Sequence, residues 1–319
     1  MFQNQYMVVP AKCKPLLFLL ILLGTSFLST RTFAQTAATI PSSVSSFELA
    51  SKNECVVIRP VVNMYSKPSQ SADVISQAIY GTNVFRIKAK WHWANIRTAD
   101  NYAGWVRLSN LRKLNGQPYP SAGSAVRVSE LSANLYREPN VTKHAPLLTI
   151  PWESRLEALP DKVDENNRWL KVRLPDGTEA FVQNGDVSSN FTPLTVDQMI
   201  AVARTFLGVT YTWGGSSDFG FDCSGFTQML LRQRGIVMPR DADLQAAWSG
   251  VTPIERNQLR PGDLLFFGDR PDRITHTGMY IGNGQFIHDT THNHPGVQIS
   301  LLDDQPWTKL LVAARRPKS

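Results

Sequence analysis

The stretch that decides the fold is "GFDCSGF", residues 220–226, where a cysteine stands between an aspartate and a Ser-Gly pair. A Gly- and Ser-rich run, residues 214–220, precedes it, and Phe226, Met229 and Leu230 follow at helical spacing. This pattern predicts a helix with Asp222 as its N-cap and Cys223 in its first turn. Unpaired amides and the helix dipole favour a thiolate there, so Cys223 is a candidate nucleophile. A buried cysteine with a purely structural role is the alternative.

A catalytic cysteine needs a base, and four of the six histidines lie in "THTGMYIGNGQFIHDTTHNH", residues 275–294. The apolar runs around Asn283-Gly284 predict a β-hairpin. A two-residue loop puts His276 and His288 on opposite faces of the sheet, whereas a three-residue loop or a β-bulge puts them on one face. A cooperating pair therefore requires the odd loop or the bulge. In that arrangement His276 takes the thiol proton and His288 orients its ring.

The chain before this region contains a repeat. "NMYSKP" (63–68) and "WANIR" (93–97) return as "NLYREP" (134–139) and "WLKVR" (169–173). Short alternating strands broken by turns predict two small β-barrels, residues 54–113 and 124–187. After a polar linker, Thr195 and Gln198 fit the capping box of a further helix.

The first residues predict an export signal. Two lysines precede an apolar run from Leu16 to Leu23, and small residues follow up to Ala34, so we expect a signal peptide at residues 1–34. The run is shorter than the roughly 20 residues that span a bilayer, which disfavours a retained membrane anchor. Loss of this segment, which carries three basic residues and no acidic one, lowers the formal net charge from +7 to +4. That is weak support for a nucleic-acid partner, and we expect a protein of the periplasm or cell envelope.

Five ordered motifs, "GVTYTWGG", "FDCSGF", "MPRDADLQ", "LRPGDLLFF" and the histidine hairpin, resemble the NlpC/P60 family of cysteine peptidases over residues 195–316. These are papain-like hydrolases of peptidoglycan peptides, and the two repeats resemble bacterial SH3 domains. The resemblance implies an α+β chain with a papain-like C-terminal domain after two small all-β SH3-like barrels. It makes Cys223 the nucleophile, His276 the base, His288 the third, orienting group and Tyr211 a donor to the oxyanion. The family often has a serine where this chain has Ala242, which puts one substrate contact in doubt.

The order of segments is similar to that of the family's γ-D-glutamyl-L-diamino acid endopeptidases. The resemblance implies cleavage of stem peptides with a free N-terminal L-alanine, whose amine is held by Asp222, Ser224 and Tyr102. Peptidoglycan stem peptides are then the partner. A hydrolase of crosslinked murein, either a D,D-endopeptidase or an amidase, and a non-catalytic wall-binding protein are the alternatives.

The histidine-rich segment after the hairpin raises the question of a metal. His288, Asp289, His292 and His294 have no strong ligand spacing, and a metal on His288 would remove it from the triad. We therefore expect no metal and no cofactor.

Overall fold

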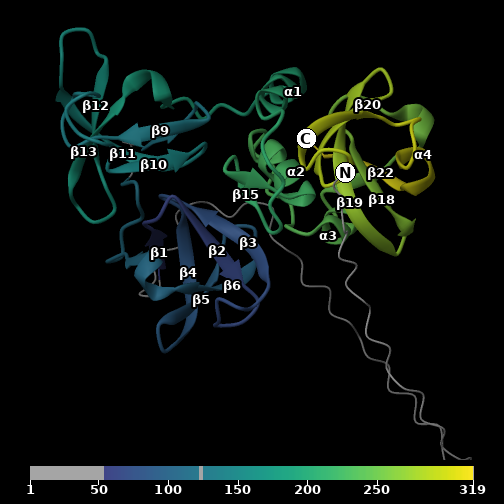
Figure 1. Ribbon diagram of the computed structural model, residues 1–319, viewed down its shortest axis with the longest axis horizontal. Helices are drawn as coiled ribbons and strands as arrows, with labels where there is room; N and C mark the ends of the chain where they lie inside the picture. Colours follow the sequence, from purple (N-terminus) through teal and green to yellow (C-terminus); the bar gives the residue numbers. More distant parts are fainter. Residues whose placement is uncertain (1–53, 122–124, 319) are drawn as a thin grey trace, which may run out of the picture. The chain divides into compact units, whose positions relative to one another are not determined.

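The computed structural model describes residues 54–121 and 125–318, and these residues fall within one unit of the chain (Figure 1). The predicted signal peptide, residues 1–34, lies outside the described residues. Within the described ranges no helix is long and apolar enough to cross a membrane.

The first β region, residues 54–113, is one antiparallel sheet in the order β3-β2-β6-β5-β4-β1-β7. Its elements are β1 (Glu54–Val57), β2 (Val61–Tyr65), β3 (Val74–Ile79), β4 (Asn83–Lys90), β5 (Trp93–Arg97), β6 (Ala103–Arg107), the 3-10 turn η1 (Leu108–Asn110) and β7 (Leu111–Lys113).

The second β region, residues 125–188, repeats this topology. Its elements are β8 (Ala125–Val128), β9 (Ser132–Leu135), β10 (Leu148–Pro151), β11 (Arg155–Lys162), β12 (Trp169–Arg173), β13 (Glu179–Gln183), η2 (Asn184–Asp186) and β14 (Val187–Ser188). The order β13-β12-β11-β8-β14 continues through a bridge between Tyr136 and Phe181 to the pair β10-β9. The two regions therefore share one strand order.

One aromatic pair accounts for the repeated sequence motifs. The tyrosine of "NMY" meets the tryptophan of "WANIR" edge to face, with Tyr65 and Trp93 ring centroids 5.5 Å apart at 89°. Tyr136 and Trp169 of the second copy lie 5.4 Å apart, also at 89°. Edge-to-face packing of this kind adds to burial alone, so the repeat preserves one stabilising contact in each β region.

The C-terminal region, residues 195–317, combines a six-stranded sheet with short helices, in the strand order β17-β22-β18-β19-β20-β21. Its elements are α1 (Val196–Thr205), β15 (Ser216–Ser217), β16 (Gly220–Phe221), α2 (Cys223–Arg232), α3 (Ala242–Ala247), β17 (Val251–Pro253), η3 (Arg256–Gln258), β18 (Leu264–Arg270), β19 (Arg273–Gly282), β20 (Gln285–Thr290), β21 (Gly296–Leu301), α4 (Trp307–Leu310) and β22 (Leu311–Pro317).

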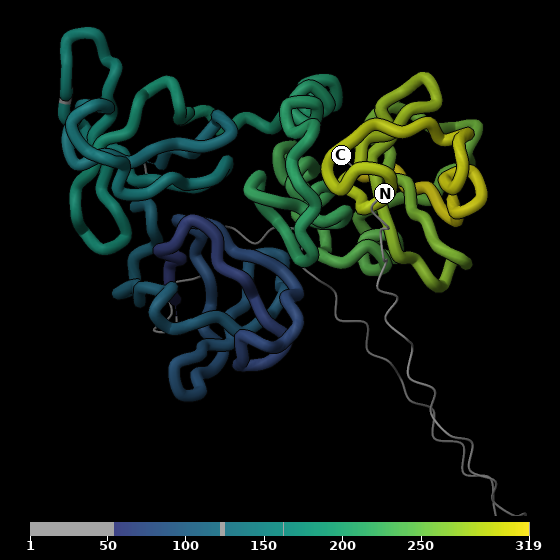
Figure 2. The backbone as a smooth tube through the Cα atoms, viewed as in Figure 1, coloured from purple at the N-terminus to yellow at the C-terminus, as the bar shows by residue number. Residues whose placement is uncertain are grey.

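Alternation along the strands gives this sheet two apolar faces. In β18, Leu264 and Phe266 join the core under α1 and α2, whereas Leu265 and Phe267 join a second core around Trp307. Helix α2 packs against β19 and β20, as the tube in Figure 2 shows. The predicted capping box between Thr195 and Gln198 is confirmed, and so is the α+β fold class.

The second β region shares a core with the C-terminal region through Trp152. This residue is 9% exposed and packs edge to face on Phe206, with the ring centroids 5.2 Å apart. Its backbone amide donates to Asp218 Oδ1 at 2.9 Å. Beside it, Glu153 accepts hydrogen bonds from the guanidinium of Arg232, the shorter one at 2.5 Å.

The substitution Trp152→Ala is predicted to lower stability, because it empties a buried aromatic site. Such a change costs about 3–5 kcal/mol. In a chain of this size it should lower the thermal midpoint by roughly 6–10 °C, measured by circular dichroism. Trp91→Ala is the matched control, since Trp91 is 77% exposed. Equal midpoints for the two variants would contradict a shared core.

Candidate active site

The start of α2 fixes the cysteine. Asp222 is the N-cap and its Oδ1 accepts the Gly225 amide hydrogen at 2.7 Å, so the predicted cap is confirmed. Cys223 is the first helical residue, an unpaired thiol that is 9% exposed. A Cβ at position 225 would lie 2.0 Å from the Gly215 carbonyl oxygen, so only glycine lets the preceding loop pack on the helix. The glycine of "CSG" therefore holds the thiol against that loop.

Behind the helix start lies a buried ion pair that the sequence did not reveal. Arg240, 2% exposed, donates from Nη1 to Asp222 Oδ1 at 2.9 Å and from Nη2 to Oδ2 at 2.7 Å. The same Nη1 donates to Ser224 Oγ at 2.8 Å, and Nε donates to Ser76 Oγ of β3 at 3.2 Å. One guanidinium thus joins both neighbours of Cys223 to the first β region.

The two histidines of the hairpin lie on one face because of a β-bulge. Tyr280 pairs with Phe286 and Gly282 pairs with Gln285, which leaves Ile281 as the extra residue. Of the two arrangements that allow cooperation, the structure therefore has the bulge. His276 Nε2 lies 2.8 Å from His288 Nδ1. Position 278 must be glycine here, since a Cβ would lie 2.9 Å from His288 Cβ.

Three of the predicted catalytic residues line one cavity of about 340 Å³: Tyr211, Cys223 and His276. Trp213, which is 71% exposed, and Trp307 also line it. His288 is fully buried behind His276 and does not line the cavity. The cavity thus offers a substrate the Cys223 thiol, the Tyr211 phenol and the imidazole of His276, with His292 also in its wall.

Of the two histidines after the hairpin, His292 lines the cavity and His294 does not. The ring of His292 lies 5.4 Å from that of Trp307, and the carbonyls of His292 and His294 accept from Gln298 Nε2. Over residues 54–121 and 125–318, no group of three or more His, Cys, Asp or Glu side chains is placed to hold a metal ion.

The ionisation of the cysteine differs from the prediction. Burial, and next the negative charge of Asp222, raise the pKa of Cys223 to about 12, and burial lowers the pKa of His276 to about 4. The expected thiolate is therefore wrong for the free protein. The helix start does donate stabilising amides, but desolvation outweighs them. The thiol and the imidazole are both neutral at pH 7, and the proton must move when substrate arrives.

The predicted amine-binding residues divide into two groups. Asp222 and Ser224 are buried, and the carboxylate of Asp222 already accepts five hydrogen bonds, from Gly214, Gly225, Ser224 and twice from Arg240. A direct contact of Asp222 with substrate stays a prediction.

Tyr102 instead donates to a carboxylate that sequence reasoning missed. Its hydroxyl lies 3.2 and 3.1 Å from Asp241 Oδ1 and Oδ2, and both side chains are half-buried. Burial raises the pKa of Asp241. Next to this pair, Asp100 Oδ2 accepts from Gln228 of α2 at 2.8 Å. Asp241 follows Arg240 in the "MPRDADLQ" motif, which was the only available signal.

The pKa of Cys223 predicts how its reactivity depends on pH. Below its pKa the thiolate fraction of a thiol rises tenfold per pH unit. The rate of iodoacetamide alkylation at the Cys223 peptide, followed by mass spectrometry, should therefore rise about tenfold per unit from pH 7 to pH 10 without a plateau. A plateau reached below pH 7 would show a preformed thiolate and contradict the neutral pair.

Two family models match this chain, one in the C-terminal region and one in the first β region. The model of the NlpC/P60 family matches residues 208–316, and that of the bacterial dipeptidyl-peptidase Sh3 domain matches residues 64–111. A γ-D-glutamyl-L-lysine dipeptidyl-peptidase of Bacillus cereus is 31% identical over 76% of this chain and 74% of its own length. One of Bacillus subtilis is 31% identical over 76% of this chain and 80% of its own.

The solved structures agree on the fold. A crystal structure of an NlpC/P60 family protein from Bacillus cereus aligns with a TM-score of 0.73 over 83% of this chain and 100% of that one, at 24% identity. With the sequence matches above, the conclusion is that this chain belongs to the NlpC/P60 family of cysteine peptidases.

Proposed function

We propose that this protein is an exported peptidase that hydrolyses the γ-D-glutamyl-diamino acid bond of peptidoglycan stem peptides with a free N-terminal L-alanine. The observation that carries the proposal is the cavity that Cys223 and His276 both line, with His276 hydrogen-bonded to His288 behind it. Two relatives named γ-D-glutamyl-L-lysine dipeptidyl-peptidases support the bond type. Export rests on the sequence of residues 1–34.

The hydrogen bonds of the site suggest which atom moves the proton. His276 Nε2 is engaged by His288, so Nδ1 is the nitrogen left to accept the thiol proton. Sγ of Cys223 then bonds to the γ-carbonyl carbon of D-glutamate, and the carbonyl oxygen becomes an oxyanion. Burial, which is the largest cause, raises the pKa of Tyr211, so its hydroxyl keeps the proton that it donates to that oxyanion.

The intermediate collapses in two steps. The C–N bond breaks, the amine of the diamino acid leaves with the proton held by His276, and an acyl-enzyme remains on Sγ. Water then attacks the thioester while His276 takes one of its protons. The thiol leaves, regains a proton from His276, and the L-Ala-D-Glu dipeptide is released.

Selection of a free N-terminus follows from the carboxylate of Asp241, in the C-terminal region, which accepts a hydrogen bond from Tyr102 of the first β region. Asp241 has a hydrogen-bond donor in Tyr102, and Arg240, whose positive charge acts on Asp241, is committed to an ion pair with Asp222. An alanine ammonium would supply the missing positive charge, whereas an acylated or glycan-linked alanine would leave a half-buried carboxylate unpaired. Tyr102 and Asp241 therefore act together as the site for the substrate's amine.

The activity is tested with L-Ala-γ-D-Glu-diaminopimelate and its N-acetyl form, followed by liquid chromatography and mass spectrometry. The mature protein should release L-Ala-D-Glu from the free peptide, with kcat/KM at least about 100-fold above that for the acetylated peptide. Cys223→Ala should be inactive on both. Equal cleavage of the two peptides would remove the selection for a free amine, and cleavage of intact crosslinked murein would favour the rival hydrolase.

The role of Asp241 is tested separately. Asp241→Asn keeps the shape and removes the charge, which for a charge pair of this kind costs about 2–5 kcal/mol. Its kcat/KM for the free peptide should fall at least tenfold, while its kcat/KM for the acetylated peptide should not fall. Asp243→Asn, at an exposed neighbour, is the control. A parallel loss on both peptides would contradict amine recognition by Asp241.

A further inference from the structure

The second nitrogen of His288 has a partner of its own. His288 is fully buried, and its Nε2 lies 3.0 Å from Ser300 Oγ while its Nδ1 lies 2.8 Å from His276 Nε2. Burial lowers the pKa of His288, so its ring is neutral and carries one proton on one of the two nitrogens. The nitrogen that carries it decides which nitrogen of His276 is free.

The required proton positions form one consistent chain. His276 can accept the thiol proton at Nδ1 only if its own proton sits on Nε2. That proton is donated to His288 Nδ1, which must then be an acceptor, so the proton of His288 sits on Nε2. The Nε2–H group is buried and needs an acceptor, and Ser300 Oγ lies at hydrogen-bond distance. The opposite tautomer of His288 would place its proton on Nδ1. His276 Nε2 would then be the acceptor, and the proton of His276 would sit on Nδ1, where it blocks acceptance of the thiol proton.

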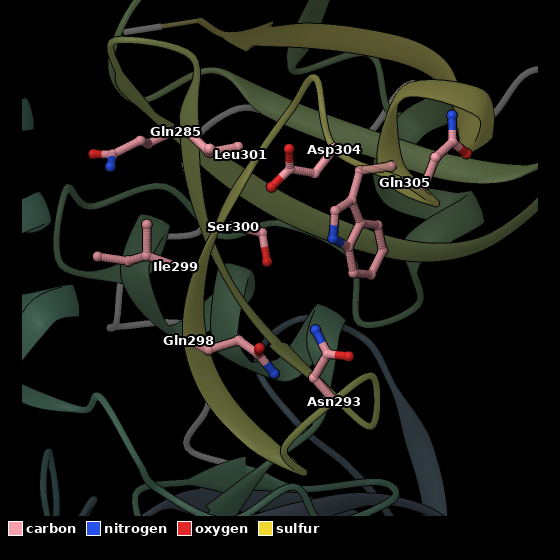
Figure 3. Close-up of a pocket in the computed structure, with 9 residues that line it drawn as sticks. Gln285, Asn293, Gln298, Ile299, Ser300, Leu301, Asp304 and Gln305 are labelled. Carbon is pink, nitrogen blue, oxygen red and sulfur yellow. The ribbon is translucent and has the colours of Figure 1, made fainter.

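The strand register between β20 and β21 brings Ser300 to His288. Ser300 in β21 pairs with Phe286 in β20, two residues before His288, so all three side chains stand on one face. On the far side Ser300 lines a polar cavity of about 300 Å³ with Gln285, Gln298 and Asp304 (Figure 3). The hydroxyl hydrogen of Ser300 can therefore turn towards a polar space, which leaves its oxygen free to accept from His288.

We propose that Ser300 is a positioning residue of the active site, whose hydroxyl oxygen holds the proton of His288 on Nε2 and thereby keeps Nδ1 of His276 free to act as the base. The proposal rests on the proposed function, because it assigns a role within the same cysteine and histidine site. The side chain of Ser300 lies outside the substrate cavity, so it affects turnover without contacting substrate.

The test compares Ser300→Ala with Ser300→Thr in the full-length mature protein. The alanine variant should lower kcat on the free tripeptide at least about tenfold with KM within twofold, since an orienting group is lost and no substrate contact is. The threonine variant keeps a hydroxyl, has the cavity of Figure 3 for its methyl group, and should recover most of kcat. Gln285 lines the same cavity and makes no hydrogen bond to His276 or His288, so Gln285→Ala should match the wild type.

A second readout is independent of activity. Nitrogen-15 NMR of histidine-labelled Cys223→Ala protein should show His288 protonated on Nε2, and adding Ser300→Ala should shift the population towards Nδ1. An unchanged tautomer, or an alanine variant with wild-type kcat, would overturn the role of Ser300. Loss of kcat that threonine does not restore, with both thermal midpoints unchanged, would also overturn it. A wild-type protein inactive on every peptide, with the tautomer shift present, would instead reject the proposed function and leave the hydrogen-bond role standing.

Discussion

The buried pair between Asp222 and Arg240 is the interaction on which the rest of the site depends. Removing one partner of such a pair costs about 3–5 kcal/mol, because the other charge is left without compensation. Here the pair caps the helix that carries Cys223, and the same guanidinium reaches Ser224 and Ser76. The first β region therefore contacts the site, since Ser76 accepts from Arg240 and Tyr102 donates to Asp241, the residue proposed to bind the substrate's amine.

On the other wall of the cavity, the backbone geometry of the hairpin fixes how His276 and His288 share their protons. A bulge at Ile281 and the absence of a side chain at Gly278 bring His276 and His288 to one face at hydrogen-bond distance. The same burial that orders these rings holds them and the thiol neutral. Burial therefore opposes charge on both the thiol and the imidazole, so the proposed proton transfer to His276 belongs to the substrate-bound state.

The sequence predicted the features that depend on neighbouring residues. The N-cap at Asp222, the capping box at Thr195 and the duplicated aromatic motifs follow from spacing along the chain, and all are present. Arg240, Asp241 and Ser300 were missed because their roles arise from contacts between distant segments, which no periodicity reports. The thiolate prediction was wrong for a related reason: the helix start is a local feature, whereas desolvation is set by everything packed around Cys223.

The central claim is that Tyr102 of the first β region, together with Asp241, binds the free amine of the substrate while Cys223 of the C-terminal region cleaves the peptide bond. The most direct measurement is a crystal structure of Cys223→Ala with intact L-Ala-γ-D-Glu-diaminopimelate bound. The account predicts the alanine ammonium within hydrogen-bond distance of Asp241 and Tyr102, and the γ-glutamyl carbonyl carbon beside residue 223. A peptide whose amino end points into solvent, away from the first β region, would contradict it.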